Sequence, residues 1–361
     1  MKFLISILAT TIILAGCQSP QDNGFVITGE MEGLQDGISV GLIEAESMGS
    51  EVIAETVVKD GKFVLTGSLE HPKLCTLTTN NLGLLSEEEM ATAEKVHWTY
   101  TPVFVSNTEM VIKADNYNDI PTDGYNDKFT IEGGQPQADY MEYLKLKSQS
   151  TDESGCVDWD YIKNNPKSVV SCYLANEFLQ QGYTLSADSL AFLTSTITEV
   201  PDDTVRFNEF KRLCSLAKAT VKGNPVVDLK MKDTEGNDCT LSSVIPKGKK
   251  AVLVDFWASW CGICRAATPD FIALQKELDD DIAIIGVSTD EDNAKWREAM
   301  KKDGATWPQY ILTDSARNDF FEKYRVVGVP YYLIIDTNGN VVKSPDGSVN
   351  AISLIKAMAG K

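Results

Sequence analysis

Two cysteines stand two residues apart at the end of an apolar run, in the segment WASWCGIC of residues 257–264. Cys261 and Cys264 could do three different things with this spacing. They could form a redox-active dithiol, contribute half of a zinc site, or lie as two buried sulfur atoms in a core. The rest of the sequence is needed to choose between these possibilities.

A zinc site needs about four ligands, usually from a second cysteine pair or from histidines. The only histidines, His71 and His97, lie far upstream of the pair, and the other cysteines are isolated in the sequence. We therefore favour a dithiol over zinc or a purely structural disulfide, and we expect no metal and no other cofactor. The cysteines whose pairing the sequence leaves open are Cys75, Cys156, Cys172, Cys214 and Cys239.

The predicted elements place this pair at the start of a helix. The run KKAVLVDFWAS of residues 249–259 predicts a strand in the middle of a sheet, and CRAATPDFIALQKEL of residues 264–278 predicts a helix. Unpaired N–H groups and the helix dipole favour a thiolate at a helix N-terminus. We therefore predict that Cys261 is the nucleophile and that Cys264, slightly further along and more buried, is the resolving thiol.

Two segments resemble the thioredoxin superfamily. VDFWASWCGIC of residues 254–264 resembles its active-site segment, and VVGVPYYLIID of residues 326–336 resembles its cis-proline loop and the strand that follows. A preceding hairpin and an insertion over residues 289–314 make residues 225–361 similar to the membrane-tethered TlpA and ResA type of thiol–disulfide oxidoreductase. The resemblance implies an α/β thioredoxin fold and an enzyme of that class.

Asp255 lies inside the apolar run VLVDFWA, six residues before Cys261. A buried carboxylate costs free energy unless it has a partner or a task. The resemblance implies that Asp255 is the general acid–base that takes the proton from the resolving cysteine, often through a water. The alternative is an aspartate bonded locally to the backbone at a strand edge.

The resemblance also assigns substrate-binding residues. It implies a cis Val329–Pro330 bond opposite the dithiol, which would turn the Val329 backbone outward to pair with an extended substrate. Trp260 is expected to shield the dithiol at this surface.

The sequence departs from the family pattern at two positions. Ala267 stands where ResA-type reductases carry a glutamate, and Tyr331 follows the proline where many thioredoxins have threonine. The dipeptide Gly262-Ile263 offers no side-chain hydrogen bond to a thiolate, unlike the histidine of strongly oxidising members. We therefore expect a reductant, and the missing glutamate leaves a role in cytochrome maturation open.

The N-terminus has the features of a secretory signal. A basic start is followed by the apolar run of residues 3–14 and then by small residues. Leu14-Ala15-Gly16-Cys17 resembles a lipobox, which implies removal of residues 1–16 and acylation of Cys17. We expect a lipoprotein of the cell envelope, at the outer membrane facing the periplasm, because Gln18 rather than aspartate follows. The alternative is an ordinary export signal.

Three domains are predicted after this signal. Residues 17–135 alternate apolar and polar positions, with hairpin-type turns at Asp36-Gly37 and Asp60-Gly61, and predict a small antiparallel β-domain of the sandwich type. Residues 136–223 have the spacing of amphipathic helices and predict a helical connector, in which Ser186 begins one helix. Residues 224–361 alternate strands and helices and predict the thioredoxin-like domain.

The chain carries 52 acidic and 33 basic residues, a net charge of −19, without a basic stripe. Nucleic acid is therefore excluded as a partner. The predicted function is reduction of disulfides in exported proteins, with electrons from a thiol–disulfide transducer in the membrane.

Two other functions are weighed against this one. One is a ligand-binding lipoprotein whose thioredoxin domain is accessory. The other is a peroxidase of the peroxiredoxin type, whose motif requires threonine and proline where this chain has Ala258 and Val254.

Overall fold

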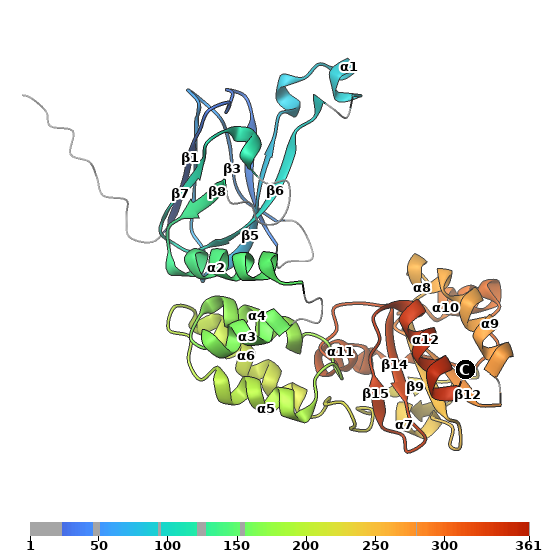
Figure 1. Ribbon diagram of the computed structural model, residues 1–361. Coiled ribbons are helices and arrows are strands. Elements are labelled where there is room, and N and C mark those ends of the chain that lie inside the picture. Colours follow the sequence, from blue (N-terminus) through green and yellow to red (C-terminus); the bar gives the residue numbers. More distant parts are fainter. Residues whose placement is uncertain are drawn as a thin grey trace, which may run out of the picture. The chain divides into compact units, whose positions relative to one another are not determined.

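A computed structural model describes residues 24–45, 51–92, 95–120, 128–151, 156–278 and 280–360. The chain divides into two compact units, residues 1–148 and 149–361 (Figure 1). The predicted signal at residues 1–16 and the predicted lipidation site Cys17 lie outside the described residues. Within the described ranges, every helix is too short or too polar to cross a membrane.

Unit 1 is a β-sandwich, which confirms the predicted β-domain. Its two sheets have the strand orders β4-β1-β7-β8 and β3-β2-β5-β6. Neighbouring strands are antiparallel except for β1 and β7, which are parallel. The elements of this unit are β1 (Phe25–Glu30), β2 (Ser39–Glu44), β3 (Val52–Val57), β4 (Lys62–Gly67), β5 (Lys73–Asn80), η1 (Leu82–Leu84), α1 (Glu87–Met90), β6 (Trp98–Val105), β7 (Glu109–Ala114), η3 (Tyr117–Asp119), β8 (Phe129–Glu132) and α2 (Gln135–Gln149).

The two predicted turns lie where the chain passes from one sheet to the other. Asp36-Gly37 joins β1 to β2 and Asp60-Gly61 joins β3 to β4, and in each case the two strands belong to different sheets. The Gly61 N–H donates to Asp36 Oδ1 at 3.0 Å, so the turns lie side by side. Because β1 pairs with β4 and β2 with β3, the four strands form one long hairpin that bends at this corner. Lys59 and Lys62 form an isolated antiparallel bridge across Asp60-Gly61, so a tight hairpin turn is confirmed there, although the strands that flank each turn continue in different sheets.

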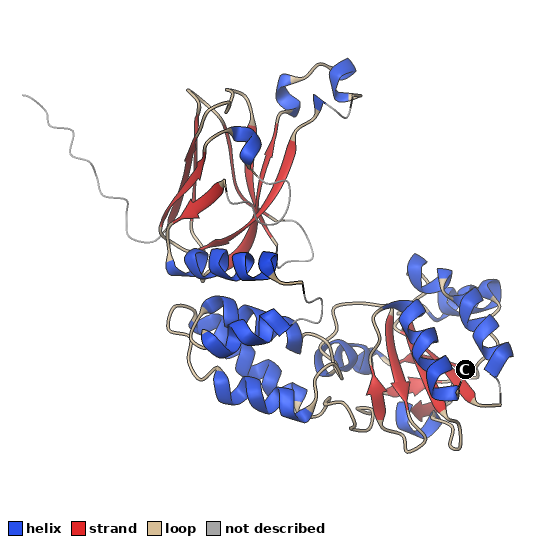
Figure 2. Cartoon of the chain, in the orientation of Figure 1, coloured by secondary structure: helices blue, strands red, loops and turns tan. Residues whose placement is uncertain are grey.

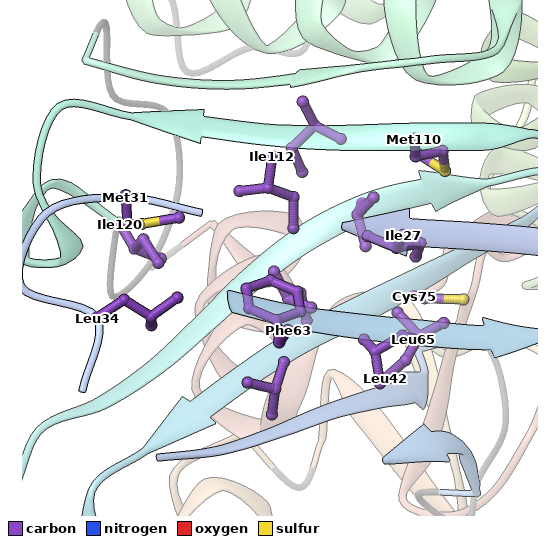
Figure 3. Close-up of a cluster of buried hydrophobic side chains, with 14 of the residues drawn as sticks. Ile27, Met31, Leu34, Leu42, Phe63, Leu65, Cys75, Met110, Ile112 and Ile120 are labelled. Carbon is purple, nitrogen blue, oxygen red and sulfur yellow. The ribbon is translucent and has the colours of Figure 1, made fainter. Parts of the chain in front are cut away.

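The core of unit 1 fills the space between the two sheets. In β4 buried and exposed residues alternate, so that Phe63 and Leu65 point inward. Figure 3 shows these side chains directed toward Ile27 of β1 and Leu42 of β2, with Cys75 among them. Cys75 is 0 % exposed, so its sulfur packs as part of the apolar core.

Unit 2 begins with four helices. They are α3 (Cys156–Asn164), α4 (Val169–Leu179), α5 (Ala187–Thr196) and α6 (Thr204–Ala217). Ser186 caps α5 by accepting from the Ser189 N–H, which confirms the predicted helix start. The helical region expected over residues 136–223 is therefore divided, because α2 lies mostly in unit 1 whereas α3–α6 belong to unit 2.

The helices are followed by a seven-stranded sheet with the order β10-β9-β13-β12-β11-β14-β15. β11, β12 and β13 run parallel, and the other neighbouring pairs are antiparallel. Figure 2 shows helices around this sheet, which confirms the predicted α/β class. The elements are β9 (Lys230–Lys232), β10 (Asp238–Thr240), α7 (Leu241–Val244), β11 (Ala251–Trp257), α8 (Gly262–Ala266), α9 (Thr268–Leu278), β12 (Ile282–Ser288), α10 (Asn293–Asp303), β13 (Gln309–Leu312), α11 (Asp314–Lys323), β14 (Tyr331–Ile335), β15 (Val341–Lys343) and α12 (Gly347–Ala359).

Strand β11 is buried on both faces, as its unbroken apolar run predicts. Leu253 packs in a cluster with residues of α9 and α12, whereas Val254 and Phe256 pack with residues of α11 on the opposite face. Side chains alternate along a strand, so Asp255 lies on the face of Leu253. The end of this strand leads directly into the segment that carries the cysteines.

The helical part of unit 2 contributes to the core under the sheet. Tyr183, between α4 and α5, is 0 % exposed and belongs to the cluster of Phe256 and Tyr324. Its hydroxyl donates to the Pro225 carbonyl at 2.6 Å and accepts from the Val227 N–H at 2.7 Å. The loop between α4 and α5 therefore contributes Tyr183 to the core of the sheet domain.

We predict that Tyr183→Ala lowers the free energy of unfolding of the sheet domain by about 3–5 kcal/mol, the usual cost of removing a buried aromatic ring. Urea denaturation followed by tryptophan fluorescence measures this change. Val349→Ala is the control, because Val349 of α12 is 73 % exposed and its loss should have little effect. A Tyr183→Ala variant whose sheet domain unfolds at the wild-type urea concentration would show that Tyr183 does not stabilise this core.

Candidate active site

Cys261 and Cys264 form a disulfide with a Cα–Cα distance of 5.3 Å. Cys261 is the N-cap of α8, and its Sγ accepts a hydrogen bond from the Cys264 N–H at 3.2 Å. The predicted position at a helix start is therefore confirmed. In this oxidised state both residues are buried, with 5 % of Cys261 and 3 % of Cys264 exposed.

Asp290, which the sequence analysis missed, holds the segment before the dithiol. Its carboxylate accepts from the Ser259 N–H at 2.8 Å and from the Ser259 hydroxyl at 2.7 Å. The Ser288 hydroxyl donates to the same carboxylate at 2.7 Å. Asp290 follows β12, which is parallel to β11, so both segments leave the same edge of the sheet. Ser259 and Asp290 are polar residues that closely follow the buried strands β11 and β12, and this pattern in the sequence could have predicted their contact.

Asp255 is 6 % exposed, and its Oδ1 has no hydrogen-bond partner among the described residues. Burial raises the pKa of this carboxyl to about 7. β11 pairs with β12 on one side and with β14 on the other, so Asp255 is not on a strand edge. The alternative of an aspartate at a strand edge is therefore wrong. Asp255 lies in an interior strand, and the packed neighbouring elements bury its side chain.

A cavity of about 10 Å³ lies between Asp255 and Cys264. Its volume is about what one water molecule needs. The indole Nε1 of Trp307, which also lines the cavity, is buried and has no partner in the described part of the chain. The cavity could therefore hold a water that connects the carboxyl to the resolving thiol. Its other lining residues are Trp257, Thr268, Met300, Asp303, Ala305 and Gln309.

A second carboxylate lines the same cavity. Asp303, the last residue of α10, accepts two hydrogen bonds from Arg265, at 2.7 Å from Nε and 2.6 Å from Nη2. The sequence alone predicts no second carboxylate here, because Ala267 occupies the position at which ResA-type reductases carry a glutamate. Here one comes from the insertion over residues 289–314, which only the fold brings next to α8.

The two tryptophans near the dithiol have different surroundings. Trp257 is 6 % exposed and donates from Nε1 to Gln309 Oε1 at 3.0 Å. It packs with Trp296 in the same cluster as both cysteines. Trp260 is 69 % exposed, whereas Trp257 and Trp296 are buried with the two sulfurs. Trp260 and Ile263, which is 71 % exposed, form an apolar rim beside the disulfide.

The Val329–Pro330 peptide bond is cis, which confirms the bond implied by the resemblance. The Val329 carbonyl oxygen lies 3.6 Å from Cys261 Sγ. Within the described residues, the Val329 backbone forms no hydrogen bond with another backbone group. This segment therefore lies opposite the dithiol with backbone groups available to a ligand.

Two other cysteines are poor candidates for the same chemistry. Burial raises the pKa of the Cys172 thiol to about 12 and that of the Cys214 thiol to about 11. A thiol with such a pKa carries almost no thiolate at neutral pH. Neither residue competes with Cys261 as a nucleophile.

Two family models match the chain. The Redoxin model matches residues 221–356, which include the disulfide and the cis-proline. A domain of unknown function (DUF4369) matches residues 25–140, which form the β-sandwich and the first turns of α2.

Several proteins are similar to the part that contains the disulfide. The chain is 32% identical over 121 residues to the thioredoxin-like protein YneN of Bacillus subtilis, over 33% of this chain and 67% of that relative. It is 26% identical over 129 residues to the thiol-disulfide oxidoreductase ResA of the same organism, over 36% and 69% of the two chains. The solved thioredoxin domain of a thiol-disulfide oxidoreductase from Bacteroides vulgatus shares 29% identity, over 38% of this chain and 98% of that chain, with a TM-score of 0.36.

The buried carboxyl predicts a specific dependence of stability on pH. The pKa of Asp255 rises from its ordinary value of 3.8 to about 7 in the folded protein. Between these values the folded state keeps a proton that the unfolded state releases, so the free energy of unfolding falls as the pH rises from about 4 to 8. Asp255→Asn removes this term. The stability difference between variant and wild type should therefore grow across that window, by about 4 kcal/mol at most.

Urea denaturation of the oxidised protein at several pH values measures this difference. Asp270→Asn in α9 is the matched control, because it removes an exposed carboxylate from a helix that packs on the face of β11 that carries Asp255. A difference between Asp255→Asn and wild type that stays constant from pH 4 to pH 8 would show that Asp255 does not titrate in this range.

Proposed function

Because the chain belongs to the thioredoxin superfamily, as a thiol–disulfide oxidoreductase of the TlpA/ResA type, we propose that it is anchored to a membrane and reduces disulfides of exported proteins through Cys261 and Cys264. The observation that carries this proposal is the arrangement around the disulfide. A buried carboxyl lies behind the resolving sulfur, across a cavity of the size of one water, and an available backbone segment lies 3.6 Å in front of Cys261.

The reaction proceeds in two exchanges. The Cys261 thiolate attacks one sulfur of the substrate disulfide, which forms a mixed disulfide and releases the other substrate sulfur as a thiolate. Cys264 then attacks Cys261 Sγ, releases the second substrate thiol and forms the disulfide seen here. Two electrons and two protons pass from the enzyme dithiol to the substrate.

Asp255 takes the proton from Cys264 in the second exchange. A thiol must lose its proton before it attacks, and a carboxyl with a pKa of about 7 can both accept and return a proton near neutral pH. A water in the cavity would carry the proton between the two groups. The same carboxyl would protonate Cys264 again when a donor reduces the enzyme.

The substrate binds at the rim in front of the disulfide. An extended segment pairs with the backbone of Val329, next to Pro330, and the exposed indole of Trp260 packs against its side chains. Such backbone pairing depends little on the side chains of the substrate. This site suits a reductase that accepts several exported proteins.

Each turnover leaves the enzyme oxidised, so it requires an outside source of electrons. The periplasm is kept oxidising, and a thiol–disulfide transducer in the membrane can supply reducing equivalents there. Acylation of Cys17 would hold the enzyme in the cell envelope, at the outer membrane facing the periplasm. The lipobox-like residues 14–17 support this part of the proposal.

Replacement of the resolving thiol tests the reaction. We predict that Cys264→Ser accumulates mixed disulfides with its substrates, because Cys261 still attacks but no internal thiol releases the product. Non-reducing gels of membrane extracts should show covalent adducts that disappear with reductant. Identification of the trapped proteins by mass spectrometry would reveal the substrate class.

Cys261→Ser is the control and should form no adducts. If Cys264→Ser also forms none while the wild-type dithiol cycles between its two states, the proposed reaction is wrong and the ligand-binding alternative gains support. Oxidation of Cys261 to a sulfenic acid by a hydroperoxide, with release of the alcohol and without protein adducts, would favour the peroxidase.

Replacement of Cys17 tests the membrane anchor. Cys17→Ala should move the protein from the membrane fraction to the soluble fraction, because acyl chains contribute about 0.8 kcal/mol for each buried CH₂ group. Flotation of membranes on a density gradient, followed by immunoblotting, measures the distribution. Incorporation of labelled palmitate into the wild type and not into Cys17→Ala is the companion measurement. A variant that stays in the membrane fraction would exclude Cys17 as the anchor.

A further inference from the structure

Neither family model matches most of the helical segment α3–α6, yet this segment contacts the loop that faces the dithiol. We use the name cis-proline loop for residues 325–331. Its last residue, Tyr331, follows Pro330 directly and is 5 % exposed. The Tyr331 hydroxyl donates a hydrogen bond to the carbonyl of Gly182, which lies between α4 and α5. This contact explains why tyrosine stands here, because the shorter threonine of many thioredoxins could not reach Gly182.

The backbone approaches closely at the same place. The Gly182 N–H donates to the Tyr324 carbonyl, one residue before the loop. A Cβ atom on residue 182 would lie 2.6 Å from the Tyr324 carbonyl oxygen, which is closer than side-chain carbons come to backbone oxygens. Only glycine allows the helical segment to come this near to the loop.

The first residue of the cis-proline loop is held by the same segment. Arg325 is 5 % exposed and has a φ of 52°, in the left-handed region that costs free energy for a residue with a side chain. Its guanidinium donates to the carbonyl of Leu179 and to the hydroxyl of Thr220. Leu179 ends α4, so the cation meets a carbonyl that has no partner within the helix and lies at the negative end of the helix dipole.

The burial of Arg325 is unusual, because its guanidinium donates to two neutral acceptors in the described part of the chain, the Leu179 carbonyl and the Thr220 hydroxyl. Burial lowers the pKa of this side chain to about 10, so it is still charged at neutral pH. A buried charge without a carboxylate partner is costly. The fold therefore keeps a strained and desolvated arginine at the start of the loop, where its contacts fix the backbone.

These contacts fix both ends of the loop and leave its middle accessible. Val327 is 65 % exposed, and Val329 lies with its carbonyl oxygen 3.6 Å from Cys261 Sγ. The position of Val329 relative to the sulfur therefore depends on where residues 325 and 331 are held. Tyr331 pairs with Phe256 of β11, and the two ends of the loop are further held by residues 179 and 182 of the helical segment and by Thr220, which follows α6.

We propose that the helical segment α3–α6 places the substrate-binding backbone of Val329 against the dithiol, with Tyr331 and Arg325 as positioning residues. This inference rests on the proposed function. A disulfide in an extended peptide reaches Cys261 in the right orientation only when the peptide backbone pairs with Val329. A small disulfide has no peptide backbone, so its reduction depends only on attack by Cys261 Sγ. The helical segment thus sets the affinity for protein substrates and leaves the thiol chemistry unchanged.

Tyr331→Phe in the full-length protein tests this role, because it removes one hydroxyl and keeps the ring in the core. The reduced enzyme is assayed with an extended peptide that contains an intermolecular disulfide and with hydroxyethyl disulfide. The KM for the peptide should rise about two- to tenfold, the effect of losing one hydrogen bond. The kcat for the peptide and the kcat/KM for hydroxyethyl disulfide should stay at the wild-type values.

Tyr324→Phe is the matched control. Tyr324 is 0 % exposed and lies in the same aromatic cluster, but its hydroxyl donates to the Val227 carbonyl at 2.6 Å, outside the helical segment and the loop. This variant loses one buried hydrogen bond as well, so it reports the effect of destabilisation alone. It should leave the KM for the peptide unchanged.

Gly182→Ala approaches the same loop from the helical side. The added methyl group would push against the Tyr324 carbonyl, so the KM for the peptide should rise as in Tyr331→Phe. Circular dichroism confirms that the variants are folded before the assay. Agreement between these two variants, which lie on opposite sides of the contact, supports positioning by the helical segment.

Three results would overturn the proposal. An unchanged KM for the peptide in Tyr331→Phe would show that the contact does not place Val329. An equal loss of activity with both disulfides, or an equal effect of Tyr324→Phe, would show a purely structural role. In these cases the wild type still reduces both disulfides and the proposed function stands, whereas a wild type that reduces neither overturns the proposed function and this inference together.

Discussion

The structure around the dithiol depends on the burial of one carboxyl group. Asp255 lies in β11, an interior strand of the sheet, where neighbouring strands and helices exclude water and raise its pKa to about 7. A carboxyl at this place destabilises the fold whenever it is charged, so its surroundings must be stable enough to tolerate it. The same burial gives it a pKa at which it can exchange a proton with Cys264 across a cavity of about 10 Å³.

The groups on the two sides of the disulfide are supplied by different parts of unit 2. Behind Cys264, α10 and the residues after it bring Asp303, Trp307 and Gln309 to the cavity. In front of Cys261, the cis-proline loop is held by the helical segment, which precedes the sheet in the sequence. The thioredoxin-like fold therefore contains the disulfide, and two further segments add groups around it: one lines the cavity behind Cys264 and the other contacts the cis-proline loop.

Local patterns predicted some contacts correctly and others incorrectly, for physical reasons. The turns at Asp36-Gly37 and Asp60-Gly61 formed because their backbone preferences are local. The strands that flank each turn do not pair with each other along their length. Instead β1 pairs with β4 in one sheet and β2 with β3 in the other, because each strand must bury one face in the core between the sheets. Asp290 and Asp303 escaped the sequence analysis because each lies far along the chain from the cysteine segment that it contacts.

The sequence by itself determined the α/β class, the dithiol at a helix start, the buried position of Asp255 and the cis-proline segment. The first three follow from patterns in the chain such as an unbroken apolar strand and the spacing of two cysteines, whereas the cis bond before Pro330 was implied by the resemblance of residues 326–336 to the thioredoxin superfamily. Only the tertiary structure decided what surrounds them. Asp303 lines the cavity, and Trp257 and Trp296 pack with the two cysteines. The Gly182 carbonyl accepts a hydrogen bond from the Tyr331 hydroxyl. Packing brings these distant segments of the chain together. No local pattern encodes such contacts, since their free energy arises from burial shared between elements that the chain meets only after folding.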